Sequence, residues 1–311
     1  MQTLICGSLA FDTIMVFPDR FKNHILAEKI HMLSVAFLVP ELRREWGGTA
    51  GNIAYNLKLL DGEPVIMATV GSDFGPYRER LDTLGISRRC VREIADSYTA
   101  QAFITTDLDD NQITAFHPGA MNFSHLNHIA DAPDARIAVI APDGREGMLQ
   151  HAQECRAAGV PYLFDPGQGL PMLTGEEIMT FLDGARFFAV NDYEAQLLSD
   201  KTGLALEQLA QKVEAGIVTR GAEGSTILHA GESLHIPAVT PDAVVDPTGC
   251  GDAYRAGLLY GLSRGWSWTK TGRLASLMGS VKIASRGGQN HAPSRSELAQ
   301  RFLAAFGETL D

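Results

Sequence analysis

Cysteine is scarce in this chain, and its placement argues against two classes of protein. The 311 residues include four cysteines, which lie 65 or more positions apart, and no Cys-x-x-Cys pair occurs. Structural zinc sites and small disulfide-stapled domains both need paired, closely spaced cysteines. We therefore expect neither kind of site, and we expect the thiols to be reduced.

Long apolar runs are also lacking. The longest of them, such as residues 65–70, are far shorter than the roughly 20 residues that cross a bilayer as a helix. The opening residues MQTLICGSLAFD have no basic segment followed by a long apolar core, so they do not resemble a signal peptide. These absences predict a cytoplasmic protein without a membrane partner.

Positive charge is in the minority. The chain has 26 Lys and Arg residues against 37 Asp and Glu residues, which gives a formal net charge of −11. This balance argues against a protein whose main task is to bind nucleic acid or an anionic membrane. A phosphate ligand would have to be bound locally, by main-chain N–H groups, a few cationic side chains and a metal ion.

Four common motifs of nucleotide and hydrolytic chemistry are absent as well. The sequence has no G-x-x-x-x-G-K-[ST] P-loop, no G-x-G-x-x-G fingerprint, no G-x-S-x-G nucleophile elbow and no H-E-x-x-H zinc motif. Any phosphate chemistry must therefore use a different loop.

What is present is an alternation of short apolar runs and amphipathic stretches. Hydrophobic residues make up 45% of the chain, which is enough for a large core. The apolar runs predict strands over residues 3–7, 64–71, 137–141, 161–165, 187–191 and 216–219. Helical patterns cover residues 49–60, 75–84, 146–158, 176–182, 192–198 and 206–213. This order predicts an α/β fold with a central, mostly parallel sheet sandwiched by helices.

Two segments interrupt that alternation. Residues 97–107 and 112–118 alternate apolar and polar side chains and predict a β-hairpin, and residues 11–45 are equally irregular. We expect segments 11–45 and 97–118 to form a small β-rich lid on the main sheet. The rest of the chain predicts a second hairpin over residues 225–230 and 233–238, and helices over residues 251–263, 268–285 and 295–306.

A glycine-rich string, DPTGCGD at residues 246–252, ends where a helix is predicted to begin. Its glycines let main-chain N–H groups converge, and the helix N-terminus adds partial positive charge. Gly249, Cys250 and Gly251 are therefore predicted to form an anion hole. Asp252 is either a residue that stabilises the helix start, or a base that accepts the proton of a hydroxyl attacking a phosphoryl group.

Other candidate sites follow predicted strands or precede predicted helices. WGGTAGN at residues 46–52 is either a tight turn with a buried Asn or a backbone approach to a small polar ligand. NDYE at residues 191–194 is either a plain helix start or a place where Glu194 holds Mg²⁺-bound water. VTRGAEG at residues 218–224 is either a turn or a loop beside a nucleotide. Asp12 is either a solvated turn residue or a ligand of vicinal hydroxyls.

Together these strings resemble the ribokinase-like (PfkB) family of carbohydrate and nucleoside kinases, over nearly the whole chain. Residues 47–52 are similar to the family's N-terminal signature, and residues 246–252 to its more specific C-terminal signature. Asn191 and Glu194 match its N-x-x-E motif. The resemblance implies that residues 1–311 form one ATP-dependent kinase domain, in which a β-lid covers the acceptor.

The resemblance also assigns roles by position. Asp252 would be the catalytic base beside the anion hole. The residues implied to hold the acceptor's hydroxyls are Asp12, Gly48 and Asn52. Those implied to bind ATP are Asn191, Thr219, Gly221, Gly224 and His291. The implied metal ligands are Glu194 for Mg²⁺, indirectly, and Asp246, Thr248 and residues 285–294 for K⁺.

Within the family, three strings resemble the nucleoside kinase branch, at residues 116–121, 246–249 and 252–257. Phe103 and Phe116 are expected either to sandwich a base or to pack inside the lid. Gln168 would offer a donor and an acceptor to the edge of the base. Residues 97–121 contain no Arg or Lys, which favours an uncharged acceptor over a sugar phosphate.

We therefore predict a Mg²⁺- and ATP-dependent kinase that phosphorylates the 5′-hydroxyl of a ribonucleoside, with adenosine, inosine or guanosine as preferred acceptors. The resemblance also implies K⁺ binding and a homodimer formed through the lid. A ribose or other sugar kinase is the nearest alternative; it would use free sugar and be indifferent to Phe103→Ala. A non-catalytic nucleoside sensor would keep the fold without turnover, but the intact string around Asp252 counts against it.

Overall fold

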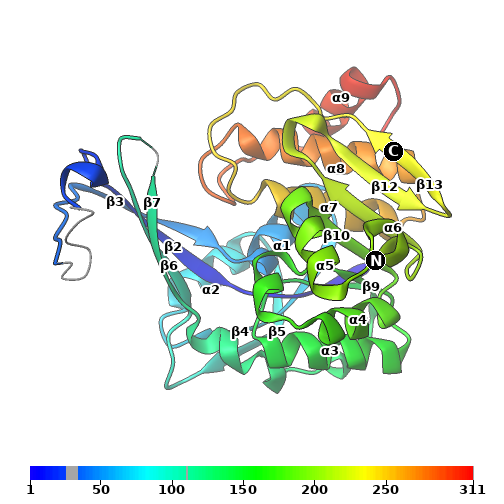
Figure 1. The fold of residues 1–311 in the computed structure, drawn as a ribbon, viewed down its shortest axis with the longest axis horizontal. Helices are drawn as coiled ribbons and strands as arrows, with labels where there is room; N and C mark the ends of the chain where they lie inside the picture. Colours follow the sequence, from blue (N-terminus) through cyan, green and yellow to red (C-terminus); the bar gives the residue numbers. More distant parts are fainter. Residues whose placement is uncertain (26–33, 110, 311) are drawn as a thin grey trace.

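The computed structural model describes residues 1–25, 34–109 and 111–310. In this part of the chain, nine strands form one main sheet in the order β13-β12-β11-β10-β9-β8-β1-β4-β5 (Figure 1). Neighbouring strands are parallel except in the pairs β11–β12 and β12–β13. The strands are β1 (Gln2–Cys6), β4 (Glu63–Gly71), β5 (Ser87–Ile94), β8 (Ala135–Ile140), β9 (Tyr162–Phe164), β10 (Phe187–Asn191), β11 (Ala215–Thr219), β12 (Ser225–His229) and β13 (Glu232–Ile236).

Helices cover both faces of this sheet, as the continuous apolar runs predict. Within β1, Ile5 joins the core cluster under α1, α7 and α8, whereas Leu4 and Cys6 join the cluster under α3 and α4. Figure 1 shows α7 and α8 on one side of the sheet, and α3 and α4 on the other. The helices are α1 (Thr49–Leu59), α2 (Gly75–Thr83), α3 (Arg145–Ala158), α4 (Gly175–Gly184), α5 (Asp192–Thr202), α6 (Leu206–Ala210), α7 (Cys250–Ser263), α8 (Trp268–Ile283) and α9 (Arg295–Phe306).

Among the helices that the structure describes, none combines the length and the apolar character that a membrane span requires.

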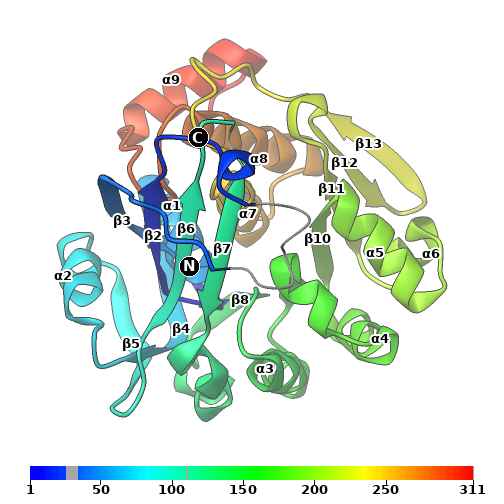
Figure 2. The same cartoon turned by 60° about the vertical axis from the view of Figure 1, so that its left-hand side comes forward.

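Four more strands form a second, smaller sheet that extends to one side of the main sheet (Figures 1 and 2). They are, in order across it, β3 (Glu41–Gly47), β2 (Ala10–Val16), β6 (Ala100–Thr106) and β7 (Gln112–His117). Strands of segments 11–45 and 97–118 thus pair in one sheet; residues 26–33 and 110 of these segments are outside the described residues. Whether this sheet acts as a lid stays a prediction.

The strand register sorts the side chains of the small sheet onto two faces. Asp12 pairs with Ala102, and Ala102 pairs with Phe116, whereas Phe103 pairs with Ala115. Because paired residues share a face and successive residues alternate, Phe116 lies on the face of Asp12 and Phe103 lies on the opposite face. The prediction that both rings sandwich one base is therefore wrong. Packing inside the lid does not describe them either, since Phe103 is 40% exposed and Phe116 is 53% exposed.

Elsewhere the predictions miss details at edges and ends. The edge strand β5 was not predicted, because its half-exposed sequence SRRCVREI has no apolar run. Helix α6 ends at Ala210 instead of residue 213. The second hairpin turns at Ala230 and Gly231, one position earlier than predicted, and both have positive φ angles, 51° and 81°, as a type I′ turn requires.

Candidate active site

The start of α1 lies against the loop that follows β1. Gly48 precedes the helix with a φ of 84°, and a Cβ atom there would lie 2.5 Å from the carbonyl oxygen of Ser8. A Cβ atom on Gly51 would collide with the Tyr77 hydroxyl. These glycines allow the close packing that buries Asn52, which is 5% exposed, at the sheet edge.

The glycine-rich string at residues 246–252 forms a turn and the first residues of α7. Gly249 has a φ of 77°, which favours glycine, and Cys250 begins the helix. The N–H of Cys250 donates to the carbonyl of Pro247 at 3.1 Å, so this amide already has an acceptor. The amide of Gly251 lies in the first helical turn, where no intrahelical acceptor exists. The predicted anion hole therefore depends on Gly249 and Gly251 more than on Cys250.

Asp252 lies in the same first turn and reaches across to α1. Its Oδ2 atom accepts a hydrogen bond of 2.8 Å from Nδ2 of Asn52. Burial raises the pKa of the Asp252 carboxyl from 3.8 to about 7; the Asn52 bond lowers it, Asp165 raises it and Arg255 lowers it. A carboxyl group with a pKa near neutrality is suited to accept a proton at physiological pH.

A chain of hydrogen bonds holds Asn52 in place. Its Oδ1 atom accepts from Nε2 of Gln289 at 3.1 Å, and the same Nε2 lies 2.7 Å from the Tyr77 hydroxyl. That hydroxyl donates to the carbonyl of Gly47 at 2.8 Å. Both ends of the Asn52 amide therefore contact protein groups, and Asn52 positions Asp252. Sequence reasoning missed Gln289 and Tyr77, because no local motif connects either residue to the site.

A buried ion pair beside Asp252 was also missed. Arg255, one turn along α7, donates from Nε and Nη2 to Oδ1 of Asp165 at 3.2 and 3.0 Å. Both side chains are nearly inaccessible. Since Asp165 directly follows β9, the pair joins α7 to the carboxyl end of that strand. The available signal was an Arg within the apolar stretch AYRAGLLYG of the predicted helix.

Asn191 and Glu194 cap α5 reciprocally. Oδ1 of Asn191 accepts from the N–H of Glu194 at 2.7 Å, and Oε2 of Glu194 accepts from the N–H of Asn191 at 2.8 Å. The interpretation as a helix start is thus confirmed. Burial raises the pKa of Glu194, whereas the Asn191 amide and Arg255 lower it.

The other carboxylate oxygen of Glu194 is a hard donor of the kind to which Mg²⁺ binds through water. The described residues include no group of three or more His, Cys, Asp or Glu side chains that could hold a metal ion. Glu194 would therefore hold Mg²⁺ only through water, and this role stays a prediction.

The loop after β11 lies next to this cap, at the same edge of the sheet, where the carboxyl ends of the parallel strands meet. Thr219 pairs with Asn191 in the register of β10 and β11. Gly221 has a φ of 54° and faces open space, whereas a Cβ atom on Gly224 would collide with the carbonyl of Ile236. The structure thus brings Asn191, Thr219 and Gly221 together at one edge, while Gly224 lets the chain pack against the end of β13.

His291 lies away from that edge. Its Nε2 atom is 2.8 Å from Oδ1 of Asn56, and its ring packs edge-on against Tyr55. The side chain is 4% exposed, and both partners belong to α1. The structure therefore places His291 in the core beneath α1, which argues against the predicted contact with ATP.

Asp246 closes the turn before α7 with its own side chain. Its two carboxylate oxygens accept from the N–H groups of Thr248 and Gly287, each at 2.8 Å. Its main-chain carbonyl accepts from the ammonium group of Lys282 at 2.7 Å. A cationic side chain thus binds Asp246, one of the residues that the resemblance assigns to K⁺, and these residues do not fit that ion.

Asp12 lies within β2, not in a solvated turn. Burial, together with the nearby carboxylates of Glu45 and Asp246, raises its pKa from 3.8 to about 6. Oε2 of Glu45, beside it in the register, accepts from Nδ2 of Asn290 at 2.7 Å. The face of the small sheet that carries Asp12 is therefore turned toward the turn before α7 and the loop after α8.

The two other side chains predicted to contact a base are accessible. Phe116 is exposed on the face of Asp12, and Gln168 is exposed in the 3-10 segment η5 (Gly167–Met172) that follows β9. Their contact with a base stays a prediction.

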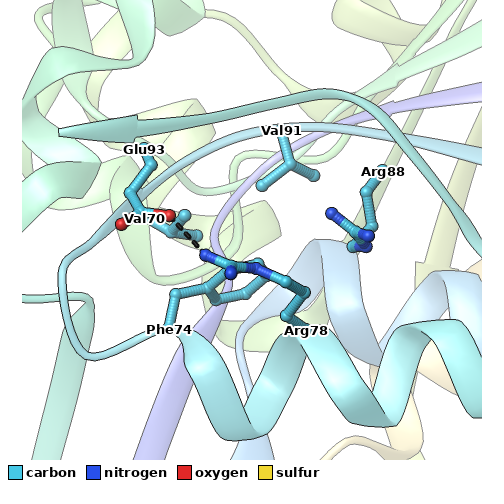
Figure 3. A pocket seen from close by; sticks show the side chains of 6 residues that line it. All are labelled: Val70, Phe74, Arg78, Arg88, Val91 and Glu93. Atoms are coloured by element: carbon cyan, nitrogen blue, oxygen red, sulfur yellow. Dashed lines mark hydrogen bonds and ion pairs between the residues drawn. The ribbon is translucent and has the colours of Figure 1, made fainter.

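A separate pocket of about 300 Å³ lies at the far edge of the main sheet, between α2 and β5 (Figure 3). Its cationic side chains are already paired, Arg78 with Glu93 and Arg88 with Asp82. The pocket contains none of the residues discussed above, so we assign it no part in the site. Its lining residues are Val70, Phe74, Arg78, Arg88, Val91 and Glu93.

The arrangement of Asp252, the first turn of α7 and the Asn191–Thr219 edge agrees with the comparison to known families. A family model described as pfkB family carbohydrate kinase matches residues 11–295. The chain belongs to the pfkB family. It is therefore a phosphotransferase with a ribokinase-like fold.

Solved structures support this assignment. A Burkholderia thailandensis nucleoside kinase, in complex with inosine, is 54% identical over 99% of both chains, with a TM-score of 0.91. The complex of that kinase with ADP-inosine superposes with a TM-score of 0.88 over 99% of this chain and 97% of the other. A Thermotoga maritima ribokinase, 20% identical over 97% of this chain and 99% of its own, shares the fold with a TM-score of 0.78.

A relative from another organism is also similar to this chain over nearly its full length. A nucleoside kinase of Methanothermobacter thermautotrophicus is 32% identical over 98% of this chain and 96% of its own length.

Replacement of Asp252 by Asn should remove the proton acceptor and preserve the hydrogen bond to Asn52. We expect kcat to fall about 10²–10⁴-fold with little change in acceptor affinity. Steady-state kinetics and the Tm at pH 8 check this. The Tm should not fall, because ionisation of a carboxyl with a raised pKa opposes folding above that pKa. Asp200→Asn, at an exposed position of α5, is the control. A near-normal kcat in Asp252→Asn would reject the assignment of Asp252 as the catalytic base.

The pKa of Asp252 also predicts a pH profile. The folded pKa of about 7 means that the carboxylate form is lost as pH falls through 7. We expect kcat/KM to rise from pH 5.5 to a plateau above pH 8, with a midpoint near 7 and a loss at pH 5.5 of roughly 30-fold from Asp252 alone. Protonation of Asp12, with a pKa of about 6, should steepen the acid limb. A flat profile over this range would contradict the assignment.

Proposed function

We propose that the protein is an ATP-dependent kinase that phosphorylates the 5′-hydroxyl of a ribonucleoside, with purine nucleosides as the preferred acceptors. The observation that carries the proposal is the Asn52–Asp252 hydrogen bond, which holds a partly buried carboxylate beside the first turn of α7. The Burkholderia relative, solved with inosine and with ADP-inosine, supports a nucleoside acceptor.

The chemistry follows from these positions. Since Asn52 donates to Oδ2 of Asp252, Oδ1 is the atom left to accept the proton of the 5′-hydroxyl. The deprotonating oxygen attacks the γ-phosphorus in line, and ADP leaves on the opposite side. The amides of Gly249 and Gly251 stabilise the charge that develops on the transferring group. Mg²⁺, when bound near Glu194, supplies neutralisation of the phosphate charge.

The acceptor side is formed by the small sheet. Asp12 would accept hydrogen bonds from the vicinal hydroxyls of the ribose, beside the backbone at Gly48. Phe116, on the same face, offers a flat apolar surface for the base, and Gln168 offers polar groups to its edge. Closure of this sheet as a lid would exclude water, which otherwise competes as the acceptor.

The opposite face of the small sheet has a different composition. It carries three exposed apolar side chains: Leu42 at 65%, Phe103 at 40% and Ile113 at 44% exposure. Exposed apolar side chains gathered on one face favour contact with another protein surface. They support the predicted homodimer through the lid, which stays a prediction.

A coupled assay with ATP and a panel of acceptors tests the function. We expect purine ribonucleosides to be phosphorylated with a kcat/KM at least about 100-fold above that of free ribose or fructose, because a sugar cannot use the surface of Phe116. Preference for a free sugar would establish the sugar kinase alternative. Nucleoside binding without any ADP release would establish the sensor.

The two phenylalanines provide a matched pair of variants. Phe116→Ala should raise the KM for the nucleoside about 5- to 30-fold with a smaller effect on kcat, because the loss of a stacking surface weakens binding of the base. Phe103→Ala, on the opposite face, should leave KM within about twofold of the wild type. Steady-state kinetics at saturating ATP decide between them, and equal effects of the two variants would exclude the assigned base site.

A further inference from the structure

Lys282 is a buried cation that the mechanism above does not use. It lies near the end of α8 and is 0% exposed. Its Nζ atom donates to two main-chain carbonyls, that of Asp246 at 2.7 Å and that of Ser285 at 2.9 Å. One carbonyl belongs to the turn before α7, and the other to the loop after α8. The ammonium group therefore joins the two segments.

These two segments are the ones to which the family resemblance assigns K⁺. An ammonium group carries the same single charge as K⁺ and, like that ion, is bound by carbonyl oxygens. A K⁺ ion that used the carbonyls of Asp246 and Ser285 would have to lie next to the Lys282 ammonium, and the two like charges would repel each other at short range.

We propose that the Lys282 ammonium replaces the monovalent cation, so that the turn before α7 is organised by a residue of the chain itself and the kinase works without K⁺. The proposal rests on the phosphotransferase activity of the family and does not depend on which acceptor is used.

The contacts around Lys282 show what the ammonium would organise. The N–H groups of Val245 and Asp246 both donate to the carbonyl of Ile283, at 2.9 and 3.1 Å, so the backbone already runs alongside the end of α8. The Cys250 thiol points at the same Asp246 carbonyl, at 3.9 Å. Lys282 therefore binds the same carbonyl that Cys250, the first residue of α7, contacts. Cys250 directly precedes Gly251, whose amide belongs to the predicted anion hole.

Groups near Lys282 offset part of the cost of burying its ammonium group. Burial lowers the pKa of the ammonium group, whereas Cys250, Asp246 and Asp252 raise it. The Asp246 carboxylate is itself held by the N–H groups of Thr248 and Gly287. The ammonium thus binds two carbonyl oxygens in the electrostatic field of a fixed carboxylate, as a bound monovalent cation would.

The first test uses the unmodified protein. Activity and Tm are measured in a buffer with N-methylglucamine as the only monovalent cation, and then with KCl added to 100 mM at constant ionic strength. We expect kcat/KM to change by less than about twofold, and the Tm of the ligand-free protein to show no saturable rise. Saturable activation by K⁺ of about tenfold or more, or a saturable rise in Tm, would overturn the proposal.

The second test compares two lysines of α8. Lys282→Met removes the ammonium and keeps an unbranched side chain, whereas Lys270→Met changes a lysine in the first turn of the same helix that contacts Trp266. In buffer free of K⁺, we expect Lys282→Met to lower kcat about 10- to 100-fold, because the displaced turn misplaces the amides of α7. Lys270→Met should match the wild type. An unchanged kcat in Lys282→Met would overturn the proposal.

The Tm measurement separates this inference from the proposed function, since it needs neither nucleoside nor ATP. A protein that fails to phosphorylate nucleosides, and whose Tm is insensitive to K⁺, would contradict the acceptor assignment and support the role of Lys282. If Lys282→Met does not fold, the response of the unmodified protein to K⁺ alone decides.

Discussion

The hydrogen bond from Asn52 to Asp252 joins the first turns of two helices whose sequences lie 200 positions apart. Its geometry depends on glycines that let the loops pack closely. It also depends on Gln289, which donates to the Asn52 amide oxygen and is itself bound to the Tyr77 hydroxyl. Burial at this junction moves the pKa of Asp252 to about 7. The contact therefore orients the carboxylate beside the α7 amides, while burial at the junction raises its pKa.

Buried cations balance the acidic groups around this junction, in a chain whose net charge is −11. Arg255 pairs with Asp165 and fastens α7 to the end of β9, while Lys282 fastens the turn before α7 to the end of α8. Loss of one partner from a buried ion pair costs roughly 3–5 kcal/mol, so such contacts hold their segments firmly. The two cations thus hold α7 and the turn before it in place.

The small sheet illustrates how strand register separates two sets of side chains. One face carries Asp12 and Phe116 and is turned toward the start of α7, whereas the other carries Phe103 among exposed apolar side chains. A shift of one residue in the pairing of β6 and β7 would move Phe116 to the face of Phe103. The register of this hairpin therefore decides which of its side chains share the face of Asp12.

The sequence alone determined the parallel α/β sheet, because strands buried on both faces need continuous apolar runs. It also located the strings around Asn52, Asn191 and Asp252, because their glycines and helix starts are local features. It could not determine that Gln289 and Arg255 support the site, that Phe103 and Phe116 point apart, or that Lys282 lies where K⁺ was expected. Those facts depend on strand register and on contacts between distant segments, which only the packed tertiary structure decides.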